Sequence, residues 1–288
     1  MQVSTAAIMS TLESSATDKL AIYDWPLQGL KASRGTVLIV HGLGEHMGRY
    51  VHVAQHLNDW GFSVRGFDHF GHGLSTGVRG GLPSETRMLD DLTKVIADTR
   101  CNRPAGEPLV LIGHSMGGGI AGRFVSLKLA AVDALVMSSP ALDPGLNLIQ
   151  KALLTVLPKI APNLRIGNGL NANFICRDPA VVKAYVTDPL VHDRISARLA
   201  RVIADFGAAT IQAAPLWATP TLLMFAGDDK LVNPAGSRAF STAAPVCVKT
   251  QAFEHMFHEI FNAPDQAQVF GVLKTWLNQT IKTNASSG

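Results

Sequence analysis

The sequence predicts an α/β fold: a mostly parallel central sheet flanked by helices, with a helical insertion. Two observations predict it. Short apolar, β-branched runs alternate with longer amphipathic stretches along the 288 residues, and each apolar run is continuous rather than alternating. Continuous runs are typical of strands buried on both faces, as in parallel sheets. A hydrophobic content of 47% with 16% charged residues indicates a large core.

The individual elements follow from these runs. The clearest strands are expected at Gly35–His41, Phe62–Phe67, Pro108–Gly113, Ala134–Ser138 and Thr221–Ala226. Helical patterns cover Tyr50–Trp60, Arg87–Thr99, Met116–Leu129 and Ala263–Gln279. Because strands and helices alternate, the chain is organised in strand–helix–strand units.

One region breaks this rhythm, since no convincing strand is expected from Pro140 to about Ala214. Ordinary connections in such folds are far shorter. We therefore expect a helical cap at 140–214, inserted after the sixth strand, and a core made of 1–139 and 215–288. A second helix of the cap is expected at Ile195–Ala209, after a Pro/Asn/Gly-rich stretch at Pro158–Asn173.

The first helix of the cap is indicated by apolar residues near helical spacing: Leu146, Ile149, Leu153, Leu154 and Leu157. We expect these side chains to pack the cap onto the core. The alternative is that some of them make transient contact with lipid or a membrane surface.

Composition excludes several classes of protein. The net charge of +3 is scattered, without the basic runs that nucleic-acid binding requires. Three widely spaced cysteines fit a reducing compartment without a disulfide framework. Residues 1–19 lack the basic and apolar regions of a secretory leader, and no apolar run is long enough to span a bilayer. We expect a cytoplasmic protein.

The segment Gly113-His114-Ser115-Met116-Gly117 matches the G-x-S-x-G pattern of a nucleophilic serine. It follows a predicted strand and opens a predicted helix, and this context makes the pattern informative. A sharp strand-to-helix turn there would lift the Ser115 hydroxyl above the sheet and direct the helix N-terminus at it. Ser115 is therefore the candidate nucleophile.

A second glycine-containing turn, His41-Gly42-Leu43-Gly44, ends the strand at Gly35–His41. Such an element supplies one backbone donor to an oxyanion hole when it is paired with a nucleophilic serine. The predicted donors are the backbone N–H groups of Leu43 and Met116.

An activated serine needs a base, and the base needs an orienting carboxylate. Where the order along the chain is serine, acid, histidine, the acid follows a late strand. Asp228 and Asp229 both follow Thr221–Ala226, and we favour Asp229 because it precedes the Lys-Leu-Val stretch where the chain turns away. Asp143 is a weaker candidate.

Two histidines could be the base, His255 and His258. Their spacing of three would allow both to bind a metal on a helix. A loop is expected here, however, and no third ligand of suitable spacing follows. We favour His258 as the base and expect no metal and no cofactor.

Taken together, these segments resemble the monoacylglycerol lipase and lysophospholipase group of α/β-hydrolases. The resemblance extends from about Leu20 to near the end of the chain. It rests on His41-Gly42-Leu43-Gly44-Glu45-His46 with Gly48-Arg49-Tyr50, on Asp68-His69-Phe70-Gly71-His72-Gly73-Leu74-Ser75, on Gly113-His114-Ser115-Met116-Gly117-Gly118, and on Asp188-Pro189-Leu190-Val191-His192. In that family the acid precedes a basic-Leu/Ile-small stretch, and the histidine follows an aromatic residue by five positions and precedes Glu. These patterns fall on Asp229 and His258.

The resemblance implies the α/β-hydrolase fold, a serine carboxylester hydrolase acting through an acyl-enzyme on Ser115, and a monoacylglycerol or lysophospholipid substrate whose acyl chain lies under the cap. Small carboxylesters, thioesters or N-terminal proline peptides are alternative substrates, and a non-catalytic binding protein on the same fold is less expected. The charged residues of the two loops, such as Glu45 with Arg49 and Asp68 with His69, are expected to hold the loops beneath the site.

Overall fold

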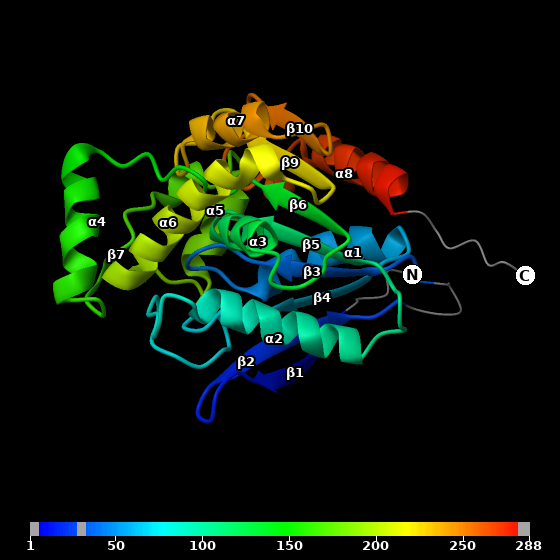
Figure 1. Cartoon of the computed structure of the whole chain (residues 1–288), viewed down its shortest axis with the longest axis horizontal. Helices are drawn as coiled ribbons and strands as arrows, with labels where there is room; N and C mark the ends of the chain where they lie inside the picture. Colours follow the sequence, from blue (N-terminus) through cyan, green and yellow to red (C-terminus); the bar gives the residue numbers. More distant parts are fainter. Residues whose placement is uncertain (1–5, 28–32, 282–288) are drawn as a thin grey trace, which may run out of the picture.

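The centre of the molecule is an eight-stranded sheet in the order β1-β2-β4-β3-β5-β6-β9-β10. The computed structural model describes residues 6–27 and 33–281, so the start of the N-terminal stretch in which we expect no leader lies outside the described residues. From β4 to β10 all neighbouring strands are parallel, and β2 and β1 extend one edge antiparallel. Helices cover both faces (Figure 1). The mostly parallel sheet that the sequence predicts is confirmed.

All five of the predicted strands are present, and three further strands at the two edges are added to them. The sheet consists of β1 Ile8–Glu13, β2 Lys19–Trp25, β3 Thr36–Val40, β4 Ser63–Phe67, β5 Leu109–His114, β6 Ala134–Ser138, β9 Thr221–Ala226 and β10 Val248–Phe253. Among the added strands, β1 and β10 are largely exposed and mixed in polarity. They lack the continuous apolar run that marks the inner strands, which is why the sequence did not show them.

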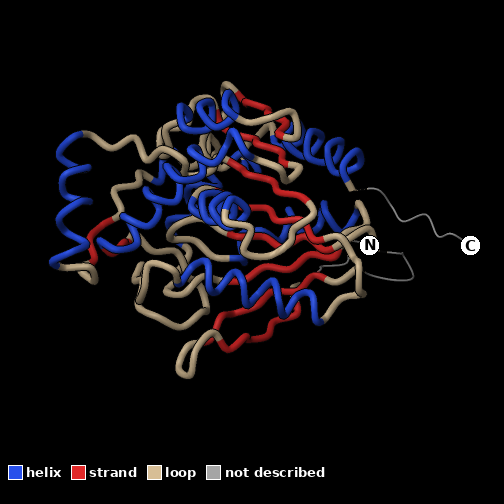
Figure 2. The backbone as a smooth tube through the Cα atoms, viewed as in Figure 1, coloured by secondary structure: helices blue, strands red, loops and turns tan. Residues whose placement is uncertain are grey.

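The helices that cover the sheet lie in two layers. On one face are α1 Val51–Asp59 and α8 Gln266–Thr280, and on the other are α2 Arg87–Cys101, α3 Met116–Ser126, α6 Ala197–Ala213 and α7 Pro234–Ala243. Single 3₁₀ turns lie at Met47–Tyr50, Ala172–Phe174, Ala214–Leu216 and Ile260–Asn262. Figure 2 shows the strands enclosed between these layers.

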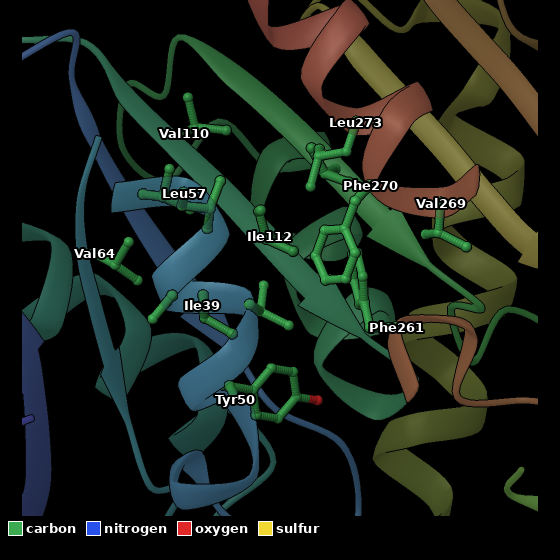
Figure 3. Close-up of a cluster of buried hydrophobic side chains, with 14 of the residues drawn as sticks. Ile39, Tyr50, Leu57, Val64, Val110, Ile112, Phe261, Val269, Phe270 and Leu273 are labelled. Atoms are coloured by element: carbon green, nitrogen blue, oxygen red, sulfur yellow. The ribbon is translucent and has the colours of Figure 1, made fainter. Parts of the chain in front are cut away.

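Alternate residues of each inner strand point to opposite layers. In β3, Val37 and Ile39 join the cluster under α1 and α8, whereas Leu38 and Val40 join the cluster under α2 and α3. Figure 3 shows the first of these clusters, in which Phe270 of α8 packs towards Ile112 of β5. Burial on both faces explains the continuous apolar runs in the sequence.

A long insertion separates β6 from β9. It contains α4 Leu148–Ile160, α5 Pro179–Thr187, α6 and two three-residue strands, β7 Arg165–Gly167 and β8 Arg194–Ser196, which pair antiparallel. The expectation that this region holds no strand is wrong, because strands of three residues are too short to produce a periodic signal. The predicted second helix corresponds to α6. We propose 140–214 as the limits of the cap, and 1–139 with 215–288 as the core.

The insertion has a docked part and an exposed part. α6 packs against α3, and its buried Leu199 and Val202 belong to the core cluster on that face of the sheet. α4 has no buried residue and stands apart from the sheet at the left of Figure 1. The expectation that Ile149 and Leu153 pack onto the core is wrong, since these side chains are 73% and 55% exposed. Leu146, Leu154 and Leu157 are partly buried.

α4 also contains a proline. Asn147 caps the helix and exchanges reciprocal hydrogen bonds with Gln150. Pro158 has no N–H, so the carbonyl of Leu154 cannot receive its usual helical hydrogen bond. The guanidinium of Arg201 in α6 donates to that carbonyl at 3.5 Å and attaches the helix to its neighbour.

Among the described residues no helix is long and apolar enough to cross a membrane.

Candidate active site

Ser115 lies at the turn between β5 and α3. Its φ of 55° is in the region that L-residues rarely adopt, and such strain is characteristic of functional turns. The turn fits only because its neighbours are glycines: a Cβ on Gly113 would lie 2.4 Å from the Gly117 carbonyl oxygen, and one on Gly117 would lie 2.1 Å from the Val40 oxygen. The G-x-S-x-G spacing therefore has a steric cause.

Three side chains form a hydrogen-bonded chain at this turn. The Ser115 hydroxyl lies 2.8 Å from Nε2 of His258, and Nδ1 of His258 lies 2.6 Å from Oδ2 of Asp229. Oδ1 of Asp229 accepts the N–H groups of Leu231 and Val232 at 2.9 and 3.0 Å. Asp229 thereby fixes the tautomer in which Nδ1 carries the proton and Nε2 can accept one from the serine.

The other candidates lie elsewhere. Asp228 is half-buried and pairs with Arg177 at 3.1 Å and with Lys230. Asp143 accepts hydrogen bonds from Asn233 and the Gly145 N–H, and His255 is exposed. Within residues 6–27 and 33–281, no group of three or more His, Cys, Asp or Glu side chains is arranged to hold a metal ion.

Burial and charge act against each other on the pKa of His258. Burial lowers it, but the adjoining Asp229 carboxylate outweighs this effect, and the pKa lies above the ordinary 6.5. Burial raises the pKa of Asp229, but His258 and the two backbone N–H groups hold it below its usual value. Asp229 therefore remains ionised, and His258 is a stronger base than an isolated imidazole.

The predicted oxyanion donors are placed beside the serine. A Cβ on Gly42 would lie 3.2 Å from Cβ of Ser115, so the turn that carries Leu43 packs directly against the nucleophile. Met116 is the first residue of α3, where backbone N–H groups have no partner within the helix. In the described part of the chain, neither the Leu43 N–H nor the Met116 N–H donates to another protein group. Both are free to bind an oxyanion.

A buried ion-pair network supports the site from below. Glu45 accepts the Gly42 N–H at 2.6 Å and the Tyr50 hydroxyl at 2.7 Å. Arg49 bridges Glu45 at 2.6 Å and Glu259 at 2.7 Å, and Glu259 directly follows His258. Burial raises the pKa of Glu45, but Arg49 together with two nearby histidines and the Tyr50 hydroxyl outweighs this effect and holds the pKa at about 2. The network therefore joins the Gly42–Leu43 turn to the loop of the base.

The second loop also serves as a scaffold. Asp68 accepts the N–H groups of Met47 and Leu74 at 2.7 Å and the Tyr23 hydroxyl at 2.9 Å. The expectation that these charged residues hold the loops is confirmed. The part of Glu259 was missed, because no local pattern links it to Arg49, 210 positions earlier in the chain.

The sequence also matches a known family. The family model described as serine aminopeptidase, S33, matches residues 31–265. The chain belongs to this family. It is 35% identical over 248 residues to the monoacylglycerol lipase of Mycolicibacterium smegmatis (85% of this chain, 88% of the relative), and 30% identical over 260 residues to phospholipase YtpA of Bacillus subtilis (87% and 98%).

A solved structure gives the same result. A soluble variant of the Saccharomyces cerevisiae monoglyceride lipase, in complex with a substrate analogue, superposes with a TM-score of 0.88 at 26% identity, covering 98% of both chains. The fold is the α/β-hydrolase fold, with its insertion after the sixth strand. The chain is a serine ester hydrolase of the family in which monoacylglycerol lipases are found.

Proposed function

We propose that this enzyme hydrolyses monoacylglycerols through an acyl-enzyme on Ser115. The observation that carries the proposal is the hydrogen-bonded chain from Ser115 through His258 to the buried Asp229, on a fold shared along its whole length with a monoglyceride lipase. Similarity to monoacylglycerol lipases supports the choice of substrate.

The arrangement supports a two-step reaction. As the Ser115 oxygen attacks the ester carbonyl, His258 takes its proton, and Asp229 stabilises the imidazolium that forms. The N–H groups of Leu43 and Met116 would stabilise the negative charge of the tetrahedral intermediate. His258 then protonates the departing alcohol and activates a water molecule, which hydrolyses the acyl-enzyme.

A groove between α4, α6 and α7 is the proposed site of the acyl chain. Its volume is about 570 Å³, and its apolar lining includes Leu142, Leu146, Leu154, Ala204, Ala208 and Ile211. One lining residue, Leu142, follows Ala141, whose N–H donates to the Ser115 carbonyl at 2.9 Å. A mainly apolar cavity of this size suits an acyl chain.

The groove can be tested by narrowing it. Ala208→Phe should lower kcat/KM for long-chain monoacylglycerols more than tenfold and leave p-nitrophenyl acetate unchanged. Ala243→Phe is the control, because Ala243 is an exposed residue of α7 outside the groove. Equal losses on both esters would contradict the assignment of the groove.

The exposed apolar face of α4 supports a peripheral contact with membranes. Leu148, Ile149 and Ile160 are 84%, 73% and 73% exposed, which is unusual for large apolar side chains gathered on one helix. Ile149→Ser with Leu153→Ser should reduce binding to phosphatidylcholine vesicles. Val246→Ser, at an apolar residue that is 83% exposed and lies in the connection between α7 and β10, should not. Unchanged binding of the α4 variant would reject this contact.

A cytoplasmic location is part of the proposal. Cys101, Cys176 and Cys247 are all unpaired, as a reducing compartment keeps them. Measuring the distribution of the native protein between cytosolic, membrane and secreted fractions tests it. Recovery mainly from the secreted fraction would reject it.

The second candidate is a lysophospholipase, favoured by the similarity to phospholipase YtpA. Both reactions use the same acyl-enzyme and differ in the leaving alcohol. A panel of monoacylglycerol, lysophosphatidylcholine, short p-nitrophenyl esters, a thioester and a prolyl anilide separates the candidates, and the highest kcat/KM identifies the substrate class.

The central experiment is fluorophosphonate labelling read by intact mass, together with glycerol release from monoacylglycerol. Wild type should gain one adduct, and Ser115→Ala none. Labelling without glycerol release would remove the proposed substrate and leave the nucleophile. Folded protein that is not labelled at all would favour the non-catalytic alternative.

A further inference from the structure

The segment from Tyr185 to His192, which ends α5 and leads into β8, lies on the loop that carries the Leu43 N–H. We infer that Asp188 is a positioning residue for the oxyanion hole and acts through His46. This inference rests on the proposed ester hydrolysis. Three contacts carry it, one at each of three positions along the loop Gly42–Tyr50.

The central contact is a hydrogen bond between side chains. Nε2 of His46 lies 2.8 Å from Oδ2 of Asp188, and the two side chains are 8% and 25% exposed. Nδ1 of His46 accepts the Gly48 N–H at 3.1 Å. Since Nδ1 is an acceptor, the proton of the neutral ring is on Nε2 and is donated to Asp188. The hydrogen bond therefore needs no positive charge on His46.

The carboxylate of Asp188 is itself held in place. Burial raises its pKa, but the hydrogen bonds from His46 and from the Leu190 N–H outweigh this effect and hold the pKa below the usual value. Oδ1 accepts the Leu190 N–H at 2.9 Å while Oδ2 accepts His46. Each oxygen of Asp188 has a separate partner, one in the cap and one in the oxyanion loop, so the side chain acts as a fixed link between them.

Two further contacts flank this link. The His192 N–H donates to the Gly44 carbonyl at 2.9 Å, and Gly44 has a φ of 77°. A Cβ at Gly44 would lie 2.4 Å from the His192 oxygen, so the two backbones are in direct contact. The guanidinium of Arg49 lies 4.7 Å from the centre of the Tyr185 ring.

These contacts determine where Leu43 lies. Its preceding residue, Gly42, is tied to Glu45 and packs against Ser115, and its following residue, Gly44, is tied to His192. A backbone donor must lie about 2.7–3.1 Å from the oxyanion to act, so a shift of roughly half an ångström weakens it. Loss of the Asp188 contact removes the side-chain hydrogen bond among the three contacts and loosens the cap side of the loop. Ser115, His258 and Asp229 keep their own hydrogen bonds. The cap thus contributes to transition-state stabilisation as well as covering the site.

The test compares Asp188→Ala and Asp188→Asn with wild type. For each protein, kcat and KM are measured on p-nitrophenyl butyrate. The rate constant of fluorophosphonate labelling and the melting temperature are measured as well. Asp188→Ala should lower kcat and the labelling rate about 10- to 100-fold, less than the 10²–10³-fold expected for removal of a whole donor, with KM within about twofold. Asp188→Asn keeps an acceptor oxygen and should recover most of the rate.

Matched variants complete the experiment. Asp193→Ala is the control, because Asp193 directly follows this segment but is 74% exposed, and among the described residues its carboxylate pairs with the adjacent Arg194 alone. His46→Gln, which keeps a donor, should behave as Asp188→Asn does, and His46→Ala combined with Asp188→Ala should lose no more than either alone.

Three results would overturn the inference: a lower melting temperature with kcat unchanged, a rise in KM alone, or an equal loss in Asp193→Ala. Short esters and the labelling rate do not depend on monoacylglycerol as substrate. Failure of the proposed substrate therefore shows as absent glycerol release in wild type, whereas failure of this inference shows as unchanged kcat in Asp188→Ala.

Discussion

The loops beneath Ser115 bury charged side chains, whereas helix α4 exposes apolar ones. In the loops, Glu45 and Arg49 are charged and nearly inaccessible to solvent. In α4, Leu148 and Ile149 are apolar and lie mostly in solvent. Ordinary folding preferences favour the reverse, since charges are costly to bury and large apolar groups are costly to expose.

Both regions therefore depart from ordinary folding preferences, but they differ in whether the unusual side chains have partners. Each buried charge in the loops has a partner at hydrogen-bond distance, so the network is rigid rather than merely tolerated. The exposed apolar face of α4 has no such partner within the described residues. The charges of one region are paired within the molecule, whereas the apolar face of the other is exposed to solvent.

The largest expected difference is between two adjacent carboxylates, the buried Asp229 and the half-buried Asp228. Asp229→Asn should lower kcat about 10⁴-fold, as the equivalent change does in a Ser-His-Asp protease, because His258 loses its orienting partner. Asp228→Asn should change kcat by less than about twofold, since the partners of Asp228 among the described residues are Arg177 and Lys230, at the surface. Steady-state hydrolysis of a p-nitrophenyl ester measures kcat of both variants. Similar losses in the two would mean that Asp229 is not the residue that orients His258.

Two arginines make the same comparison for stability. Arg49→Met leaves Glu45 and Glu259 buried without their cation and should cost about 3–5 kcal/mol of unfolding free energy. Arg238→Met breaks an exposed pair with Glu254 and should cost about 0.5 kcal/mol. Urea unfolding at neutral pH measures both.

The pH dependence sharpens this prediction. The pKa of Glu45 is depressed to about 2, so its contribution to stability is present above about 4.5, the ordinary value, and is lost as the pH falls towards 2. The cost of Arg49→Met should shrink over the same range. A cost independent of pH would mean that the lost packing of the side chain, and not its charge, explains the effect.

The next largest expected difference is in the stability cost of replacing two leucines of the cap. Leu199 of α6 is fully buried, and Leu199→Ala should cost about 2–5 kcal/mol. Leu153 of α4 is 55% exposed, and Leu153→Ala should change stability by less than about 0.5 kcal/mol. Thermal unfolding of the two variants measures the difference. A large cost at Leu153 would mean that α4 packs more closely than its exposure indicates.

The smallest expected effect is on the pH profile. Because Asp229 raises the pKa of His258 above 6.5, kcat/KM should fall on the acid side with a midpoint above 6.5. In Asp229→Asn burial acts on His258 without the opposing carboxylate, so the midpoint of the residual activity should move to lower pH. An unchanged midpoint would mean that another group controls the acid limb.

The sequence was most informative where the signal is local. The inner strands follow from continuous apolar runs, and Ser115 follows from glycines that a tight turn requires within five residues. Asp229 and His258 could be favoured because each lies in a short pattern after a late strand. The short β7 and β8, by contrast, depend on pairing with each other, and three residues carry no periodicity.

Long-range partners could not be predicted in the same way. Arg49 meets Glu259 across 210 positions, and His46 meets Asp188 across 142. Every one of these residues is also an ordinary surface residue by type, so nothing in its neighbourhood marks it as buried or paired. For a related reason the sequence did not decide between a packed and an exposed α4: a helix with an apolar face has the same pattern whether the face meets protein or lipid.

The two glycines that touch the cap have a consequence for engineering. A Cβ on Gly44 would meet the His192 carbonyl oxygen at 2.4 Å, and one on Gly80 would meet the Arg194 oxygen at 2.1 Å. Both contacts join a core loop to the stretch around β8 by backbone alone. A chimera that takes its cap from a relative must therefore match these two core positions as well, whichever side chains line the new groove. The unit that can be exchanged between such enzymes is larger than the insertion itself.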